Sequence, residues 1–124
     1  MSANVALRNK ILNDYGVAIG TGTLTIYSGT PPASADAALS GNTALATHTL
    51  TGFASAASGS MSANAIADDT IDATGTASFA RIVSGGFTEQ LTLGTSSAQV
   101  IVSSLSYVAG GTSQIISVTV TKGA

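Results

Sequence analysis

The sequence predicts an all-β fold, an antiparallel β-sandwich or jelly-roll-like barrel with one short N-terminal helix and a long proline-containing arm. Three observations support this class. Residues 74–121 contain short runs rich in β-branched and aromatic residues, and glycines mark the turns between them. A helical spacing of apolar residues occurs within the first sixteen residues. Alanine, glycine, serine and threonine account for 69 of the 124 residues, so the chain is built mainly from small side chains.

The low charge content argues against several functional classes. Only 8 % of the residues are charged, the net charge is −2, and the mean hydropathy is +0.41. The four basic residues are scattered, which argues against nucleic-acid binding, and no apolar run is long enough for a membrane helix. The absence of cysteine excludes disulfides and thiolate metal sites. We expect one domain over residues 1–124, with a surface that partners cover.

An N-terminal helix is predicted over residues 2–15. Ser2 is a candidate N-cap, because its hydroxyl can accept a hydrogen bond from an early backbone N–H. Gly16 stands where a C-terminal cap is expected. Three residues spaced by four share one face of this helix: Leu7, Ile11 and Tyr15. A helix this short is marginal alone, so we expect this face to pack on the sheet or on a neighbouring subunit.

A long interruption follows the first predicted strand. Residues 28–41 break regular structure, because Pro31 and Pro32 exclude a central strand and no β-branched residue follows them. We interpret this segment as an extended arm, since loops of this length are usually functional or bound by a partner.

The remaining chain reads as short strands and turns. Residues 23–27 alternate, with Leu24 and Ile26 on one face. Asp68 and Asp69 indicate a turn. Weaker strands are expected at 44–51 and 58–63, and stronger ones at 74–83, 87–93, 98–107 and 114–121, which make up a hairpin-rich β core over 74–121.

Two registers are possible for the first hairpin of this core. A three-residue loop pairs Arg81 with Glu89 across the strands and matches apolar residues with apolar residues. A two-residue loop instead places Ile82 opposite Glu89 and Phe79 opposite Thr92. We prefer the first register, in which Arg81 and Glu89 form a structural ion pair.

A second hairpin is expected to turn at Gly110 and Gly111. In this register Leu105 faces Ile116, and Ile101 faces Val120, with Val118 between them. Serine and threonine residues occupy the opposite face, so the core and the exterior separate along these strands.

Few residues offer catalytic or metal-binding chemistry. His48 is the single histidine, and we interpret it as a solvated or rim side chain on a strand rather than part of a catalytic dyad. Asp68, Asp69 and Asp72 form the one acidic cluster, but they lack the further ligands of a calcium site, so a solvated turn is the preferred interpretation. We therefore predict neither an enzyme nor a cofactor or metal site.

Three segments resemble the small virion structural proteins of tailed bacteriophages. They are GTLTIYSGTPPASADAA at residues 22–38, DATGTASFARIV at 72–83, and LTLGTSSAQVIVSSLSYVAGGTSQIISVTVT at 91–121. Together they cover most of the chain. The resemblance follows the pattern of strands and turns and includes no catalytic signature. It implies a structural role in the virion.

Within that family we expect a capsid decoration or cement protein on the capsid surface, which bridges major capsid protein subunits and forms dimers or trimers. Edge strands, the proline arm and the helix face would bury area against neighbouring subunits. The expected partner contacts are Leu7, Ile11, Tyr15, Tyr27, Pro31, Pro32 and Leu39. The alternatives are a tail or neck protein and, less favoured, a carbohydrate-binding or adhesin module, which would need an aromatic platform or a metal.

Overall fold

The structure, a computed structural model of the chain, describes residues 4–19, 21–57 and 60–121. This part forms one helix and ten strands, as the sequence predicts for an all-β protein. In chain order they are α1 Val5–Ile19, β1 Thr23–Ser28, β2 Ala44–Thr49, β3 Ser60–Ser62, β4 Asp69–Thr70, β5 Gly75–Ser84, β6 Phe87–Gly94, β7 Val100–Val102, β8 Ser106–Tyr107, β9 Thr112–Ser113 and β10 Ile115–Thr121.

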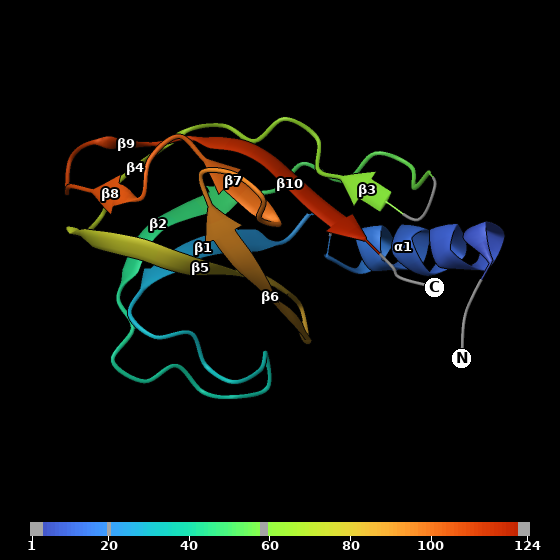
Figure 1. Cartoon of the computed structure of the whole chain (residues 1–124), viewed down its shortest axis with the longest axis horizontal. Helices are drawn as coiled ribbons and strands as arrows, with labels where there is room; N and C mark the ends of the chain where they lie inside the picture. Colours follow the sequence, from blue (N-terminus) through green and yellow to red (C-terminus); the bar gives the residue numbers. More distant parts are fainter. Residues whose placement is uncertain (1–3, 20, 58–59, 122–124) are drawn as a thin grey trace.

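One curled, mixed sheet contains eight of these strands. Its order is β2-β1-β5-β6-β7-β10-β3, with β8 paired to β5 beside this path, and β4 and β9 form a separate two-stranded ribbon. The β6–β7 pair is parallel, while the other strand pairs in the described residues are antiparallel. The helix lies at one end of the molecule beside β3, and β10 crosses the body toward it (Figure 1).

The curl brings both ends of the sheet into one core. Leu24 and Ile26 on β1 are fully buried, which confirms the face predicted from their alternation. They belong to the same apolar cluster as Leu45 on β2 and Met61 on β3, the strands at the two ends of the sheet. Because the strands at the two ends of the sheet share this cluster, the core is enclosed as in a β-sandwich, although a single sheet forms both sides.

The helix is shifted relative to the prediction of residues 2–15. It begins at Val5, where the Asn4 side chain caps it by accepting the Leu7 N–H at 2.9 Å, and Ser2 lies outside the described residues. Gly16 does not end the helix, which continues to Ile19. A Cβ at Gly16 would lie 3.1 Å from the Met61 sulfur, so this glycine serves close packing rather than capping.

The first hairpin has the register that the sequence analysis did not prefer. Phe79 lies opposite Thr92, and Ile82 lies opposite Glu89, with a two-residue turn at Gly85 and Gly86. The predicted Arg81–Glu89 pair is therefore wrong, because the two side chains are on opposite faces of the sheet.

The predicted register of the second hairpin is wrong, because Ile101 lies opposite Ser117 and not opposite Val120. Residues 98–107 divide into β7 and β8, and β8 leaves β10 to pair with β5. Val118 lies opposite Val100, and a register shift between Ile115 and Ser117 turns Ile116 outward, where it is 61 % exposed. The Gly110–Gly111 turn forms as expected, but the Gly110 N–H donates to the Ile71 carbonyl, so the turn is tied to a segment outside the hairpin.

Candidate functional site

The proline-containing segment lies against one face of the sheet instead of extending as a free arm. The predicted break covers residues 28–41; Ser28 still belongs to β1, and residues 29–43 contain no strand. Arg81, which is only 7 % exposed, donates through Nη2 to the carbonyls of Ser34 at 3.0 Å and Ala37 at 2.8 Å. Its Nε and Nη2 also donate to Gln90 Oε1, at 3.0 and 2.9 Å. The buried guanidinium thus receives carbonyl and amide partners in place of a carboxylate.

Further hydrogen bonds fix both ends of this loop. Gln90 Nε2 donates to the Pro32 carbonyl at 2.8 Å, and Asn42 Nδ2 donates to the Ser28 and Thr30 carbonyls at 2.9 and 3.0 Å. Backbone carbonyls that would otherwise face the sheet without partners are therefore satisfied. The loop is an ordered layer over the sheet, visible in Figure 1 below β1 and β5.

The expected contact residues of the loop have different environments. Tyr27 is half-buried and stacks on Phe79, with ring centroids 5.3 Å apart, so its ring is engaged within the chain. Pro31 and Leu39 are exposed, and Pro32 is half-buried. Pro31 and Leu39 are thus the two of these residues most available to a partner.

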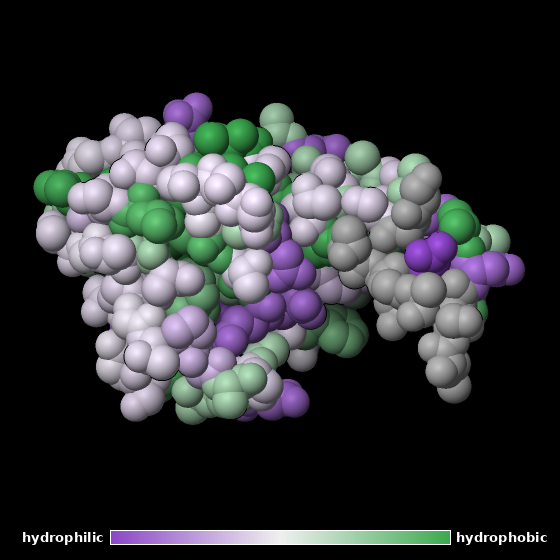
Figure 2. Space-filling view, in the orientation of Figure 1, coloured by the Kyte–Doolittle hydropathy of each residue, from purple (hydrophilic) through white to green (hydrophobic). Residues whose placement is uncertain are grey.

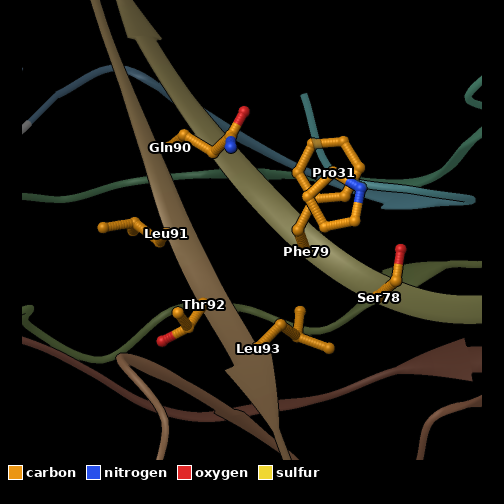
Figure 3. A pocket seen from close by; sticks show the side chains of 7 residues that line it. All are labelled: Pro31, Ser78, Phe79, Gln90, Leu91, Thr92 and Leu93. Carbon is orange, nitrogen blue, oxygen red and sulfur yellow. The ribbon is translucent and has the colours of Figure 1, made fainter. Parts of the chain in front are cut away.

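A hollow of about 310 Å³ lies between the loop and the first hairpin. Pro31 and Phe79 form one wall, Ser78 lies beside them, and β6 residues 90–93 form the other side (Figure 3). The lining combines an aromatic ring and a proline ring with the Gln90 amide. Such a mixture can accept an apolar side chain and still offer polar groups at its border.

The helix presents a second apolar surface. Leu7 is 49 % exposed and Ile11 is 40 % exposed, while Leu12 on the neighbouring flank is buried. The predicted stripe therefore lies beside the buried face of the helix. Val17, 86 % exposed, adds another apolar side chain to the open part of the helix. These residues remain available for contacts outside the chain.

Tyr15 on the helix lies near enough to Glu89 on β6 to feel its charge. Tyr15 packs edge-on against Phe53, and its hydroxyl oxygen is buried without a hydrogen-bond partner in the structure. Burial and, to a smaller extent, the negative charge of Glu89 raise the pKa of Tyr15. Burial likewise raises the pKa of Glu89. Two polar groups are thus held in an apolar setting near the edge of the sheet.

A buried polar cluster, which the sequence analysis missed, surrounds His48. The predicted strand position is correct, but the side chain is 2 % exposed and not solvated. Nδ1 donates to the Ala67 carbonyl at 2.9 Å, which leaves Nε2 to accept from the Ser113 hydroxyl at 2.9 Å. The Tyr107 hydroxyl lies 3.0 Å from Ser113 Oγ, and burial raises the pKa of Tyr107 while the Ser113 hydrogen bond lowers it.

The His48–Ser113 contact has the distance of a nucleophile and its base, but it lies within the core. Ser113 is 1 % exposed and Tyr107 is 3 % exposed. Neither residue lines the hollow beside Pro31 or a second one beside the helix. We therefore interpret the cluster as a structural hydrogen-bond network in the core, which joins β2, β8, β9 and the segment before β4. Its signal in the sequence is the alternation along β2, which places His48 on the same face as Ala46, two residues earlier and also buried.

The three aspartates do not converge. Asp69 belongs to β4, and its Oδ2 accepts the Thr47 N–H at 3.2 Å. Asp68 and Asp72 are exposed. The described residues contain no group of three histidine, cysteine or acidic side chains placed to hold a metal ion.

Comparisons with known proteins give no relative for this chain. A scan against protein-family models, a search of curated proteins and a search of solved structures each found no match. In the part of the chain that the structure describes, no helix has the length and apolar character needed to span a membrane.

Proposed function

We propose that this chain is a structural protein of a tailed-bacteriophage virion and that it decorates the capsid surface. In this role it bridges subunits of the major capsid protein, as a homodimer or homotrimer. The observation that carries the proposal is the resemblance of residues 22–38, 72–83 and 91–121 to small virion proteins.

The character of the surface supports this proposal. Only ten residues carry a charge, and Figure 2 shows a face of mostly intermediate hydropathy with separate apolar areas. Few charged groups have to lose water when such a surface is covered. Leu7 and Ile11 on the helix and Leu39 on the loop supply apolar area for these contacts.

The physical effect of decoration is stabilisation of the shell by binding. A protein that binds the assembled lattice, but not its dissociated subunits, shifts the equilibrium toward the lattice. When one copy touches two subunits, the second contact forms at a high effective concentration. Many weak contacts can therefore stabilise the particle without any one tight interface.

The test is to locate this chain in virions that contain it. We expect an image reconstruction to show its density on the outer face of the capsid, with hundreds of copies in each particle by quantitative mass spectrometry. A dozen copies or fewer, with density at one vertex or along the tail, would instead support a neck or tail protein. Absence from purified virions would contradict both.

A further inference from the structure

We propose that the outer edge of β6 at residues 88–90 is a docking site for an extended segment of a protein partner. The segment adds a strand to the sheet and carries a large apolar side chain on one face and a basic side chain on the other. The identity of this partner as a virion protein rests on the proposed function, but the edge itself is a property of the isolated chain.

The backbone of β6 is free at this place. The Thr92 N–H donates to Gln99 Oε1 at 3.0 Å and therefore points away from β5. In an antiparallel pair the outward groups belong to every second residue, so the N–H and C=O groups of Gln90 and Thr88 also point outward. The only other strand beside β6, β7, pairs with it at Leu93 and Gly94 alone. Residues 88–90 thus form an edge without a strand partner among the described residues.

The other two borders of the sheet are covered. On β2, the Thr47 N–H is bound by Asp69, and the Leu45 carbonyl accepts the Asp72 N–H at 2.7 Å. On the opposite border, the segment before β3 binds its outer side: the Ala54 N–H donates to the Ser62 carbonyl, and Ala57 and Ser60 exchange two backbone hydrogen bonds, all at 2.9 Å. Because an open edge invites pairing with another chain, the difference between β6 and these covered borders points to an occupant for β6.

The hollow beside Pro31 predicts an apolar side chain on the partner segment. It is lined by Phe79 and by Gln90, which lies on β6 at the open edge (Figure 3). A residue directly opposite Gln90 on an added strand projects from the same face of the sheet as the Gln90 side chain. A leucine- or methionine-sized side chain at that position can extend toward the hollow.

Glu89 predicts a basic side chain on the partner segment. It projects from the other face of β6, and burial raises its pKa. The described residues contain one ion pair, Lys10–Asp14 on the helix, so no described cation lies within salt-bridge distance of Glu89. A lysine or arginine beside it would supply the missing positive charge. Since neighbouring residues of a strand project from opposite faces, the apolar and basic residues of the partner are separated by an odd number of positions.

This pattern can be tested with a synthetic peptide and the full chain. The probe is an acetylated and amidated heptapeptide of sequence TVTLKVT, titrated to millimolar concentration into the ¹⁵N-labelled protein. We expect saturable shifts and slower hydrogen exchange at the Thr88 and Gln90 amides. The peptide TVTLEVT should bind about tenfold more weakly, because an attraction to Glu89 becomes a repulsion.

Two variants separate strand addition from other binding. Thr88→Pro removes one outward N–H and leaves the hydrogen bonds between β5 and β6 in place, whereas Thr88→Val keeps that N–H. We expect the Thr88→Val variant to bind the probe as the parent does and the Thr88→Pro variant to lose binding while it keeps a dispersed NMR spectrum. If the Thr88→Pro variant does not fold, TVTLKVT with N-methyl groups on the edge-facing residues makes the same comparison on the parent protein, and undiminished binding contradicts the proposal.

The outcomes distinguish this inference from the proposed function. Absence of saturable binding to the parent, or shifts confined to residues away from β6, contradicts the proposed docking site at the edge of β6. So does equal binding by a folded Thr88→Pro variant. Capsid decoration is measured separately with purified particles, and decoration without peptide binding leaves the proposed function intact. Peptide binding without decoration by the parent protein leaves the edge intact and contradicts the capsid role.

Discussion

At the scale of single residues, His48 and Arg81 depend on partners that are distant in the sequence. Ser113 lies 65 positions from His48, and the Ser34 carbonyl lies 47 positions from Arg81. The sequence shows the two side chains but not the carbonyls that accept from them or the Ser113 hydroxyl that donates to His48. For this reason the residue types predict a solvated histidine and an Arg81–Glu89 pair, while the fold supplies uncharged partners to both side chains.

The His48 cluster predicts a large cost for Ser113→Ala. This change leaves His48 Nε2 and the Tyr107 hydroxyl without their shared partner in a buried site. We expect the free energy of unfolding to fall by about 1–3 kcal/mol, measured by urea denaturation. Ser103→Ala, at an exposed position, is the matched control and should have little effect. Equal stabilities of the two variants would show that the cluster does not hold the fold together.

Glu89 predicts a pH-dependent stability. Burial raises its pKa in the folded protein above 4.5, so the folded state binds the proton more tightly than the unfolded state. The free energy of unfolding therefore decreases as pH rises from about 4.5 through the folded pKa. Glu89→Gln removes this pH dependence of the free energy of unfolding.

Thermal melting at low and neutral pH measures the effect of Glu89→Gln. The variant should match the parent near pH 3 and melt a few degrees higher at neutral pH. The exposed Asp36→Asn variant has the same change in net charge. An equal rise in both variants would attribute the effect to net charge instead of burial.

At the scale of elements, the geometry of the turn determines the register of the first hairpin, which side-chain pairing alone does not determine. The sequence allows two registers for the first hairpin, and matching of charges favours the three-residue loop, which is wrong. Gly85 has a φ of +58°, which suits the first position of a two-residue hairpin turn. This turn places Arg81 opposite Gln90, and carbonyls of the loop complete the hydrogen bonds of the guanidinium.

Gly85→Val tests this turn. A β-branched residue is strained at positive φ, and we expect a loss of stability of at least about 1–2 kcal/mol by chemical denaturation. Gly86→Val is the matched control, since Gly86 does not have a positive φ and a Cβ at either position meets nothing within 4 Å. Similar losses in both variants would argue against the two-residue turn.

Arg81→Met tests how the loop is held. Without the guanidinium, the carbonyls of Ser34 and Ala37 lose their shared donor, while an apolar side chain of similar length preserves packing below them. We expect faster proteolysis within residues 29–43 and a lower melting temperature, because these carbonyls and Gln90 Oε1 lose their donor. Lys10→Met, at an exposed helix position, should leave the cleavage rate unchanged. Unchanged cleavage in Arg81→Met would mean that the other loop contacts suffice.

At the scale of the whole molecule, local patterns predicted the class but not the path of the chain. Alternation identified the all-β class, the helix and the buried face of β1. It did not reveal that residues 98–107 change partners, from β10 to β5, or that β4 and β9 form a ribbon. These pairings depend on closure of the sheet around one core, and no short stretch of sequence encodes that closure.

The exposed flank of the helix should take part in assembly. Leu7→Lys combined with Ile11→Lys places charges on side chains that are already about half exposed, so we expect little change in melting temperature. Self-association measured by light scattering, and binding to particles measured by co-sedimentation, should both weaken because charges must then be desolvated. Val108→Lys, at a 60 % exposed position after β8, is the control. Unchanged assembly in the double variant would remove the helix from the proposed interface.

The position of β10 has a consequence for how the protein forms. This strand comes last in the described chain, yet it lies between β7 and β3 and pairs with both. During synthesis, β3 and β7 are therefore made before the strand that pairs with both of them, while the β5–β6 hairpin can form early from neighbouring residues. Until residues 115–121 are inserted between them, β3 and β7 are open to pairing with other strands.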